Sequence, residues 1–426
     1  MDEKQTVINF DITEEQLFAE MEAPVYESAE GQHFQVYPLI EGAMVLIYGT
    51  NREELSTYLK KLDESGYALY SDNCFDGDSN YFAQYRKGEH ALHVSYSHTE
   101  TAVRLIFGAI PKVDPLHLEP LGEKVTEPMI TLPSLRAGGL SIVIRLEDGG
   151  FIIVDGGVTT ERDLAELYYY LKANNVRGGK PVIHSWWITH CHGDHLQLPM
   201  EFIKRYHKEF ELRSAVHNFP DLSRIDMSYD SSEMHWNTYI RAYVDILNTY
   251  YPDAKQYICH TGEEMSFPGV KVRTLCTHEE HYPAPLAHCN QSSTTWKLTF
   301  ENGKTAIVYG DIWPELGRYI ARNFSAEFLK CDVMQVIHHG LAGAVLELYE
   351  KNDPEICLWA TGQKRFEGKF TTPEQPDYTK VHQWCTGYKG EKLIAPFNAW
   401  LRDDSIKKRQ HYSFRDDGVH NEIPIA

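Results

Sequence analysis

The stretch Thr189-His190-Cys191-His192-Gly193-Asp194-His195 places three imidazoles and a carboxylate next to one another in the chain. It follows the mostly apolar run 182–188, which is typical of a buried strand, and precedes residues 196–210, which have a helical pattern. The stretch is therefore expected to form the turn between a strand and a helix. Such a dense group of ligand-type side chains favours a metal site over a polar turn whose histidines only pack.

The spacing of these side chains predicts which of them act together. His190 and His192 lie two residues apart at the end of an extended segment, so both rings can reach one ion. Asp194 and His195 follow at the start of the helix, displaced toward a second position. Imidazole and carboxylate suit zinc, manganese or iron better than magnesium or calcium. Cys191 is expected to point away from its histidine neighbours and to be packed.

His190, His192, Asp194 and His195 match the HxHxDH signature of the metallo-β-lactamase superfamily, which the sequence resembles. One motif upstream and two downstream also occur in the family's order. They look like the strand ending in an Asp-Gly pair, the strand whose terminal aspartate bridges two ions and the strand carrying the final histidine. These motifs are Phe151–Gly157, Thr305–Asp311 and Asp332–Gly340. The resemblance covers roughly residues 135–370.

Two motifs taken together indicate a branch of the superfamily. Asn290-Gln-Ser-Ser293 precedes the Gly-Asp strand, and His338-His339-Gly340 follows it. This pairing is similar to that of the ComEC-like branch, which the soluble domain of the competence protein ComEC shares with phosphorylcholine esterases.

The resemblance implies an α/β fold, an αββα four-layer metallo-β-lactamase sandwich, preceded here by a small α+β domain. It also implies two divalent metal ions, with zinc preferred over manganese or iron. Their expected ligands are His190, His192, Asp194, His195, Asp311 and His339.

Two of these assignments have alternatives. Asp311 is expected to bridge the ions, although a carboxylate at this place could instead cap a helix predicted from Pro314 to Phe328. His338 and His339 are adjacent, so their side chains diverge and only one is expected to bind metal. His339 is favoured as the ligand and His338 as a donor to the developing negative charge.

The region around residues 278–290 departs from the broad family pattern. Most members supply a third histidine to the first ion from this region, in a Gly-His-Thr context that is absent here. His288, Asn290 or water could complete that ligand shell. A site without its third imidazole is expected to bind the first ion more weakly.

The expected function is a metal-dependent hydrolase, a phosphodiesterase acting on a small phosphodiester with a metal-bound hydroxide as nucleophile. Asp194 would orient the attacking water or receive its proton, and His338 would stabilise charge on the substrate. One alternative is a lactone, thioester or amide hydrolase with the same site. Another is a metal-binding, non-catalytic interaction protein whose cleft is covered by residues 1–130.

Composition restricts the partners. The 41 Lys and Arg residues against 61 Asp and Glu residues give a formal charge of −20, which counts against a long nucleic acid and favours a small-molecule substrate. No apolar run approaches the length of a membrane helix, and the first twenty residues are acidic, so a cytoplasmic protein without a membrane anchor is expected. The eight cysteines form no CxxC motif and are expected to be free thiols.

A proline-rich stretch from Pro111 to Pro133 predicts a boundary between a small α+β domain at residues 1–130 and a hydrolase domain at residues 131–426. In the first domain, His90, His93 and His98 are interpreted as histidines on an exposed strand face rather than ligands. Near the carboxyl terminus, a helix is expected from Tyr378 to Trp384 and a strand from Lys392 to Ala395.

Overall fold

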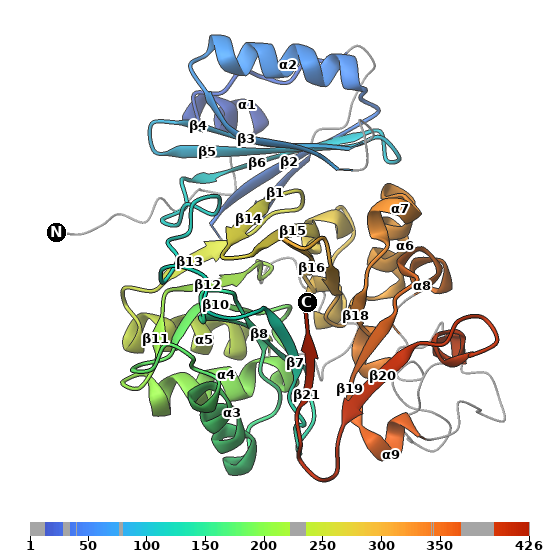
Figure 1. Ribbon diagram of the computed structural model, residues 1–426. Helices are drawn as coiled ribbons and strands as arrows, with labels where there is room; N and C mark the ends of the chain where they lie inside the picture. Colours follow the sequence, from blue (N-terminus) through green and yellow to red (C-terminus); the bar gives the residue numbers. More distant parts are fainter. Residues whose placement is uncertain are drawn as a thin grey trace.

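The protein consists of an amino-terminal sheet domain that lies against one end of a larger two-sheet sandwich (Figure 1). The structure, a computed structural model, describes residues 13–28, 35–39, 41–75, 80–221, 236–341, 343, 345–367 and 396–425. The predicted helix 378–384 and strand 392–395 lie outside these residues. None of the helices in the described ranges has the length and apolar character needed to cross a membrane.

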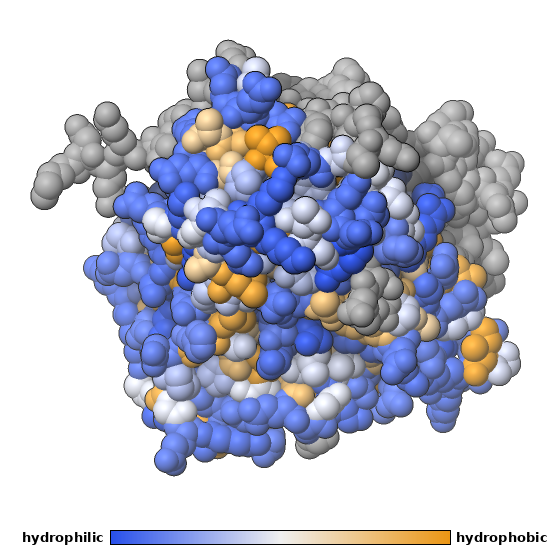
Figure 2. Space-filling view, turned by 90° about the horizontal axis from the view of Figure 1, so that it is seen from above, coloured by the Kyte–Doolittle hydropathy of each residue, from blue (hydrophilic) through white to orange (hydrophobic). Residues whose placement is uncertain are grey.

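The amino-terminal domain is an antiparallel sheet in the order β1-β2-β6-β5-β4-β3, with two helices on one face (Figure 1). Apolar residues of both helices, such as Phe18 and Leu55, pack on inward-facing strand residues such as Val45. The elements are α1 (Glu14–Glu20), β1 (Gln35–Leu39), β2 (Gly42–Tyr48), α2 (Arg52–Glu64), β3 (Ala68–Phe75), β4 (Asn80–Lys87), β5 (His90–Ser97) and β6 (Ala102–Ala109). Seen from above, the described residues present a mostly hydrophilic face (Figure 2).

The opposite face of this sheet is covered by the sandwich. His93, on β5, is 4% exposed, and its Nε2 lies 3.1 Å from the carbonyl oxygen of Thr261. The interpretation of His93 as a residue on an exposed strand face is therefore wrong. A strand pattern alone does not show that a second domain buries the other face.

The sandwich is built from two mixed sheets. The first has the order β13-β12-β10-β9-β8-β7-β21, with β11 also pairing with β10, and the second has the order β14-β15-β16-β17-β18-β19-β20. The first sheet contains β7 (Met129–Leu132), β8 (Ser141–Arg145), β9 (Phe151–Asp155), β10 (Val182–Trp187), β11 (Glu211–Leu212), β12 (Ser214–His217), β13 (Lys255–Ile258) and β21 (Asn421–Pro424). The second contains β14 (Glu264–Phe267), β15 (Val270–Cys276), β16 (Thr295–Phe300), β17 (Thr305–Val308), β18 (Val333–Gln335), β19 (Ile356–Gly362) and β20 (Gln410–Phe414).

Helices flank the two sheets (Figure 1). Between the sheets, the rings of Trp187 and Trp296 lie 5.2 Å apart. Outside the first sheet, Trp186 packs on Phe202, and outside the second, Tyr309 shares a buried cluster with helix residues such as Ile320. This arrangement confirms the predicted αββα sandwich and the small α+β domain before it.

The first sheet is covered by α3 (Glu161–Ala173), α4 (Gly193–Tyr206) and α5 (Trp236–Tyr250), and the second by α6 (Pro314–Asn323), α7 (Ala326–Leu329) and α8 (Leu346–Asn352). Shorter pieces are α9 (Gln363–Phe366), η3 (His278–His281), η4 (Cys289–Ser292), η5 (Ile337–Gly340) and η6 (Pro396–Arg402). The single helix predicted from Pro314 to Phe328 is divided, because Ser325 caps a new short helix by accepting a hydrogen bond from the Phe328 amide.

Candidate metal centre

The strand-to-helix turn that carries the histidines is fixed by Asp155, the last residue of β9. Its buried carboxylate accepts hydrogen bonds from the backbone N–H and the hydroxyl of Thr189, at 2.8 and 2.7 Å. The same carboxylate lies 2.7 Å from Nδ1 of His195, at the start of α4. Asp155 has a positive φ of 52°, so the end of the strand bends toward the turn it supports.

His190 and His192 form one half of the site. Nε2 of His190 lies 3.0 Å from Nδ1 of His192, and the hydroxyl of Thr189 lies 3.0 Å from the other nitrogen of His190. A tetrahedral ion with bonds of ~2.0–2.1 Å separates its ligand atoms by ~3.3 Å. The two facing nitrogens are therefore close to the spacing that a shared ion needs.

The other half combines residues from three parts of the chain. Nε2 of His339 lies 3.2 Å from Oδ2 of Asp311 and 3.3 Å from Oδ2 of Asp194. Nε2 of His195 lies 3.2 Å from the same oxygen of Asp311. Each of two residue triplets offers ligand atoms within 4.8 Å of one another; they are His190, His195 and Asp311, and Asp194, His195 and His339.

Asp311 reaches the centre of this group because a glycine precedes it. Gly310 has φ of +63°, and a Cβ there would meet Cβ of Thr189 at 2.8 Å, so a larger residue would push apart the two halves of the site. The hydroxyl of Ser293 accepts a hydrogen bond from the backbone N–H of Asp311 at 3.2 Å. The carboxylate of Asp311 faces the histidines and does not cap α6, whose N-cap residue is Trp313.

His338 and His339 both lie in the left-handed region, with φ of 52° and 56°. Such a conformation costs non-glycine residues on the order of 1–3 kcal/mol each and is found mainly at functional sites. Nδ1 of His339 lies 2.9 Å from the Ala360 carbonyl oxygen and donates to it, so Nε2 is the nitrogen that faces the carboxylates. The ring of His338 turns elsewhere, and its Nε2 lies 3.2 Å from Nδ2 of Asn290.

Asn290 and His288 lie in the η4 turn beside the first pair of histidines. The ring of His288 lies 5.2 Å from that of His192 and stacks on Trp313 at 4.5 Å. Its Nδ1 accepts the backbone N–H of Asn290 at 3.3 Å. Both residues proposed as a third ligand are thus next to the first position.

Burial and charge act against each other in this group. Burial lowers the pKa of His195 and His339, but the facing carboxylates outweigh it. They raise the pKa of His195 well above its usual value and that of His339 to about 10. Burial raises the pKa of Asp311, yet His339 and His195 hold it well below its usual range. The group is therefore a buried set of anionic carboxylates that is neutralised by cations.

Two buried oxygens of this group accept no hydrogen bond from the described residues. They are Oδ1 of Asp311 and Oδ1 of Asn290. A buried acceptor without a partner is costly unless an ion or water satisfies it. Together with the nitrogen–oxygen donor set, these oxygens fit a divalent transition metal.

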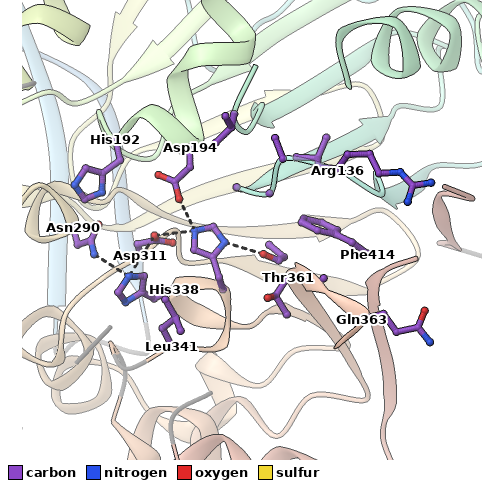
Figure 3. A pocket seen from close by; sticks show the side chains of 18 of the residues that line it. Arg136, His192, Asp194, Asn290, Asp311, His338, Leu341, Thr361, Gln363 and Phe414 are labelled. Atoms are coloured by element: carbon purple, nitrogen blue, oxygen red, sulfur yellow. Dashed lines mark hydrogen bonds and ion pairs between the residues drawn. The ribbon is translucent and has the colours of Figure 1, made fainter. Parts of the chain in front are cut away.

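The group opens into a cleft of about 720 Å³. Its polar end includes His192 and Asn290, and Arg136 and Gln363 lie at the opposite end (Figure 3). Asp163 positions Arg136 by accepting hydrogen bonds from its backbone N–H and that of the next residue, at 2.8 and 3.0 Å. No residue from the described part of 1–130 lines this cleft.

The sequence-predicted residues meet at this one place. His190, His192, Asp194, His195, Asp311, His338 and His339 all belong to the facing groups described above. Sequence reasoning missed Arg136 and the carbonyl of Ala360, which no motif marks. Cys191 is 1% exposed, as expected, and the cysteines of the described residues form no disulfide.

The fold and this group of side chains define a metallo-β-lactamase-type αββα protein with a candidate histidine–aspartate metal centre. No protein-family model and no curated protein matches the sequence. Among solved structures, yeast PDE1 is similar at 12% identity over 71% of this chain and 100% of its own, with a TM-score of 0.40.

Two other solved structures show a comparable partial likeness. The diiron β-hydroxylase CmlA from Streptomyces venezuelae is 13% identical over 71% of this chain, which spans only 55% of the hydroxylase, with a TM-score of 0.39. The metallo-β-lactamase fold protein YhfI from Bacillus subtilis is 10% identical over 70% of this chain and 100% of its own, with a TM-score of 0.37. Nothing about the activity of this chain follows from them.

Proposed function

We propose that the protein is a dinuclear metal-dependent hydrolase of the metallo-β-lactamase superfamily, and that it cleaves small phosphodiesters. The observation that carries the proposal is the convergence of the two ligand triplets within 4.8 Å on the wall of one cleft. Packing alone does not require two carboxylates and three histidines at such spacing. The ComEC-like resemblance of Asn290–Ser293 and His338–Gly340 favours phosphodiesters.

In this proposal the residues have distinct roles. His190 and His192, with Asn290, would hold the first ion, Asp194, His195 and His339 would hold the second, and Asp311 would supply its carboxylate to the centre. Zinc is the preferred metal because the set mixes imidazole with carboxylate. When bound, such ions lower the pKa of water from ~16 toward ~7 and polarise the substrate oxygen.

Asp194 and His338 have the two remaining roles in the proposed reaction. The carboxylate of Asp194 is 40% exposed, so it can accept a proton from water that enters the cleft. His338 lines the same cleft, with Nε2 3.9 Å from Oδ2 of Asp311, and stabilises negative charge on the phosphoryl oxygen.

The charges of the cleft favour a small substrate. Arg136 is the one lysine or arginine among the described lining residues, whereas Asp194, Asp311 and Asp416 also line the cleft. A long polyanion needs a row of cations. A single arginine at the end opposite the histidines instead suits a substrate with one or two charges.

The apolar part of the same wall favours a second candidate. Leu135, Leu341 and Phe414 line the cleft and could pack against an acyl chain. We therefore keep hydrolysis of a lactone, thioester or amide as the alternative. The non-catalytic alternative gains no support from the described part of residues 1–130, which does not cover the cleft.

The test is an assay of the metal-analysed protein on bis(p-nitrophenyl) phosphate and on chromogenic lactone and thioester substrates. The control is the double variant Asp194→Ala, His195→Ala. Phosphodiester cleavage that needs metal and is lost in the variant supports the proposal. Turnover of the carbonyl substrates alone favours the alternative, and bound metal without turnover on any of them contradicts both. Arg136→Gln should raise KM for the phosphodiester with little change in kcat.

A further inference from the structure

Two cysteines face each other behind the candidate first-ion position. Sγ of Cys191 lies 2.7 Å from Sγ of Cys289, and their side chains are buried, at 1% and 0% exposure. Cys191 stands between His190 and His192, and Cys289 stands between His288 and Asn290. The contact between these two sulfurs therefore lies between the two turns that carry the candidate ligands of the first ion.

The spacing is within reach of a covalent bond. A disulfide has an S–S length of ~2.05 Å, so the sulfurs need to approach by less than ~1 Å. The turns are already tied together, because the backbone N–H of Thr294 donates to the carbonyl oxygen of Thr189 at 2.9 Å. Forming the bond thus requires no rearrangement of β10 or β16, the strands next to the two turns.

We propose that Cys191 and Cys289 are a modification site at which a peroxide forms an intramolecular disulfide. In this reaction two thiols and one hydrogen peroxide give one disulfide and two waters. The cysteines lose two electrons and two protons, and the O–O bond of the peroxide is reduced. The product links residues 98 positions apart, so it restricts the unfolded chain and stabilises the fold.

The disulfide also has a local consequence. It fixes the turn of His288 and Asn290 relative to the turn of His190 and His192. No cysteine stands next to Asp311 or His339 in the printed sequence. Oxidation therefore fixes the candidate ligands of the first ion relative to one another, whatever the substrate is.

The experiment uses the full chain with Cys74→Ser, because Cys74 is exposed and would form bridges between molecules. The protein is treated with hydrogen peroxide, its remaining thiols are alkylated, and it is digested and mapped by mass spectrometry. The expected result is a peptide pair linked through Cys191 and Cys289, with a melting temperature that rises by several degrees and returns with dithiothreitol.

The matched variants separate this pair from the other buried thiols. Cys289→Ala should abolish the linked peptide and the rise in melting temperature, whereas Cys259→Ala, at another fully buried cysteine, should keep both. Alkylation of both Cys191 and Cys289 after peroxide treatment of the folded protein would overturn the proposal, as would a link to any other cysteine. The mapping of the parent protein decides this even if Cys289→Ala fails to fold.

Discussion

Oδ2 of Asp155 lies 2.7 Å from Nδ1 of His195, and both side chains are fully buried. The contact makes Nδ1 the donor, so Nε2 is the nitrogen that faces Asp311. A carboxylate behind a ligating histidine fixes the ring and makes it a better ligand. Asp155 is therefore expected to act on the metal through His195, without touching the ion itself.

The first prediction concerns this carboxylate. Asp155→Asn should lower the affinity for one ion by about 10–100-fold, because the histidine loses its anionic partner. Isothermal titration with zinc measures the effect. A matched control exists at the turn between β8 and β9, where Oδ2 of Asp148 lies 2.8 Å from Nε2 of His184 on β10. Asp148→Asn should reduce stability but leave zinc affinity unchanged; an equal loss of zinc affinity in both variants would contradict the assignment.

The second prediction separates the adjacent histidines. Nδ1 of His339 is engaged by the Ala360 carbonyl oxygen, and its Nε2 faces Asp194 and Asp311, whereas His338 contacts Asn290. His339→Ala should therefore lose one bound ion per chain in elemental analysis. His338→Ala should keep both sites occupied in excess zinc while kcat falls by about 10²-fold or more. Loss of metal in His338→Ala alone would reverse the two roles.

The candidate ligand residues could be predicted from sequence because they stand at the ends of strands with a simple apolar pattern. β9 and β10 were expected near residues 151–154 and 182–188, and both are almost continuously buried, as strands covered on both faces require. The strand β21 was not expected, since Asn421–Pro424 is short, contains proline and pairs with β7 almost three hundred residues earlier. Local patterns carry no information on such pairing.

Other features were missed because they depend on tertiary contacts. Arg136 enters the cleft from a loop whose shape is set by Asp163, on α3. His93 is buried by a second domain, which strand alternation cannot reveal. The choice between His288 and Asn290 as third ligand also depends on which atoms are turned toward the first position.

The third prediction addresses that choice. Oδ1 of Asn290 is buried and accepts no hydrogen bond from the described residues, while Nδ1 of His288 accepts the Asn290 amide. Asn290→Ala should lower the affinity for the first ion by at least about tenfold, and His288→Ala should lower it less. Zinc competition with a fluorescent chelator measures both. A larger loss in His288→Ala would identify the imidazole as the third ligand.

The last prediction concerns the contact between the domains, away from the cleft. Nδ1 of His260 lies 2.7 Å from Oε1 of Glu279, beside His93 of the amino-terminal sheet at 5.1 Å between ring centres. Burial lowers the pKa of His260, but Glu279 and then Glu263 raise it to about 9. Burial raises the pKa of Glu279, but the neighbouring His260 outweighs burial and lowers this pKa to about 2.

The two shifts define a pH window for stability. The folded pKa of His260 is above its unfolded value, so its contribution is complete below about pH 6.5 and is lost as the pH rises through 9. The folded pKa of Glu279 is below its unfolded value, so the contribution of Glu279 to stability is complete above about pH 4.5 and is lost as the pH falls through 2. His260→Gln should therefore cost on the order of 3 kcal/mol more at pH 6 than at pH 9.5. Urea unfolding of parent and variant across this range measures the difference. Burial raises the pKa of Glu280 to about 7, but Glu280 titrates in both proteins, so its contribution cancels in the comparison. A difference that stays constant with pH would show that His260 is neutral in the folded protein.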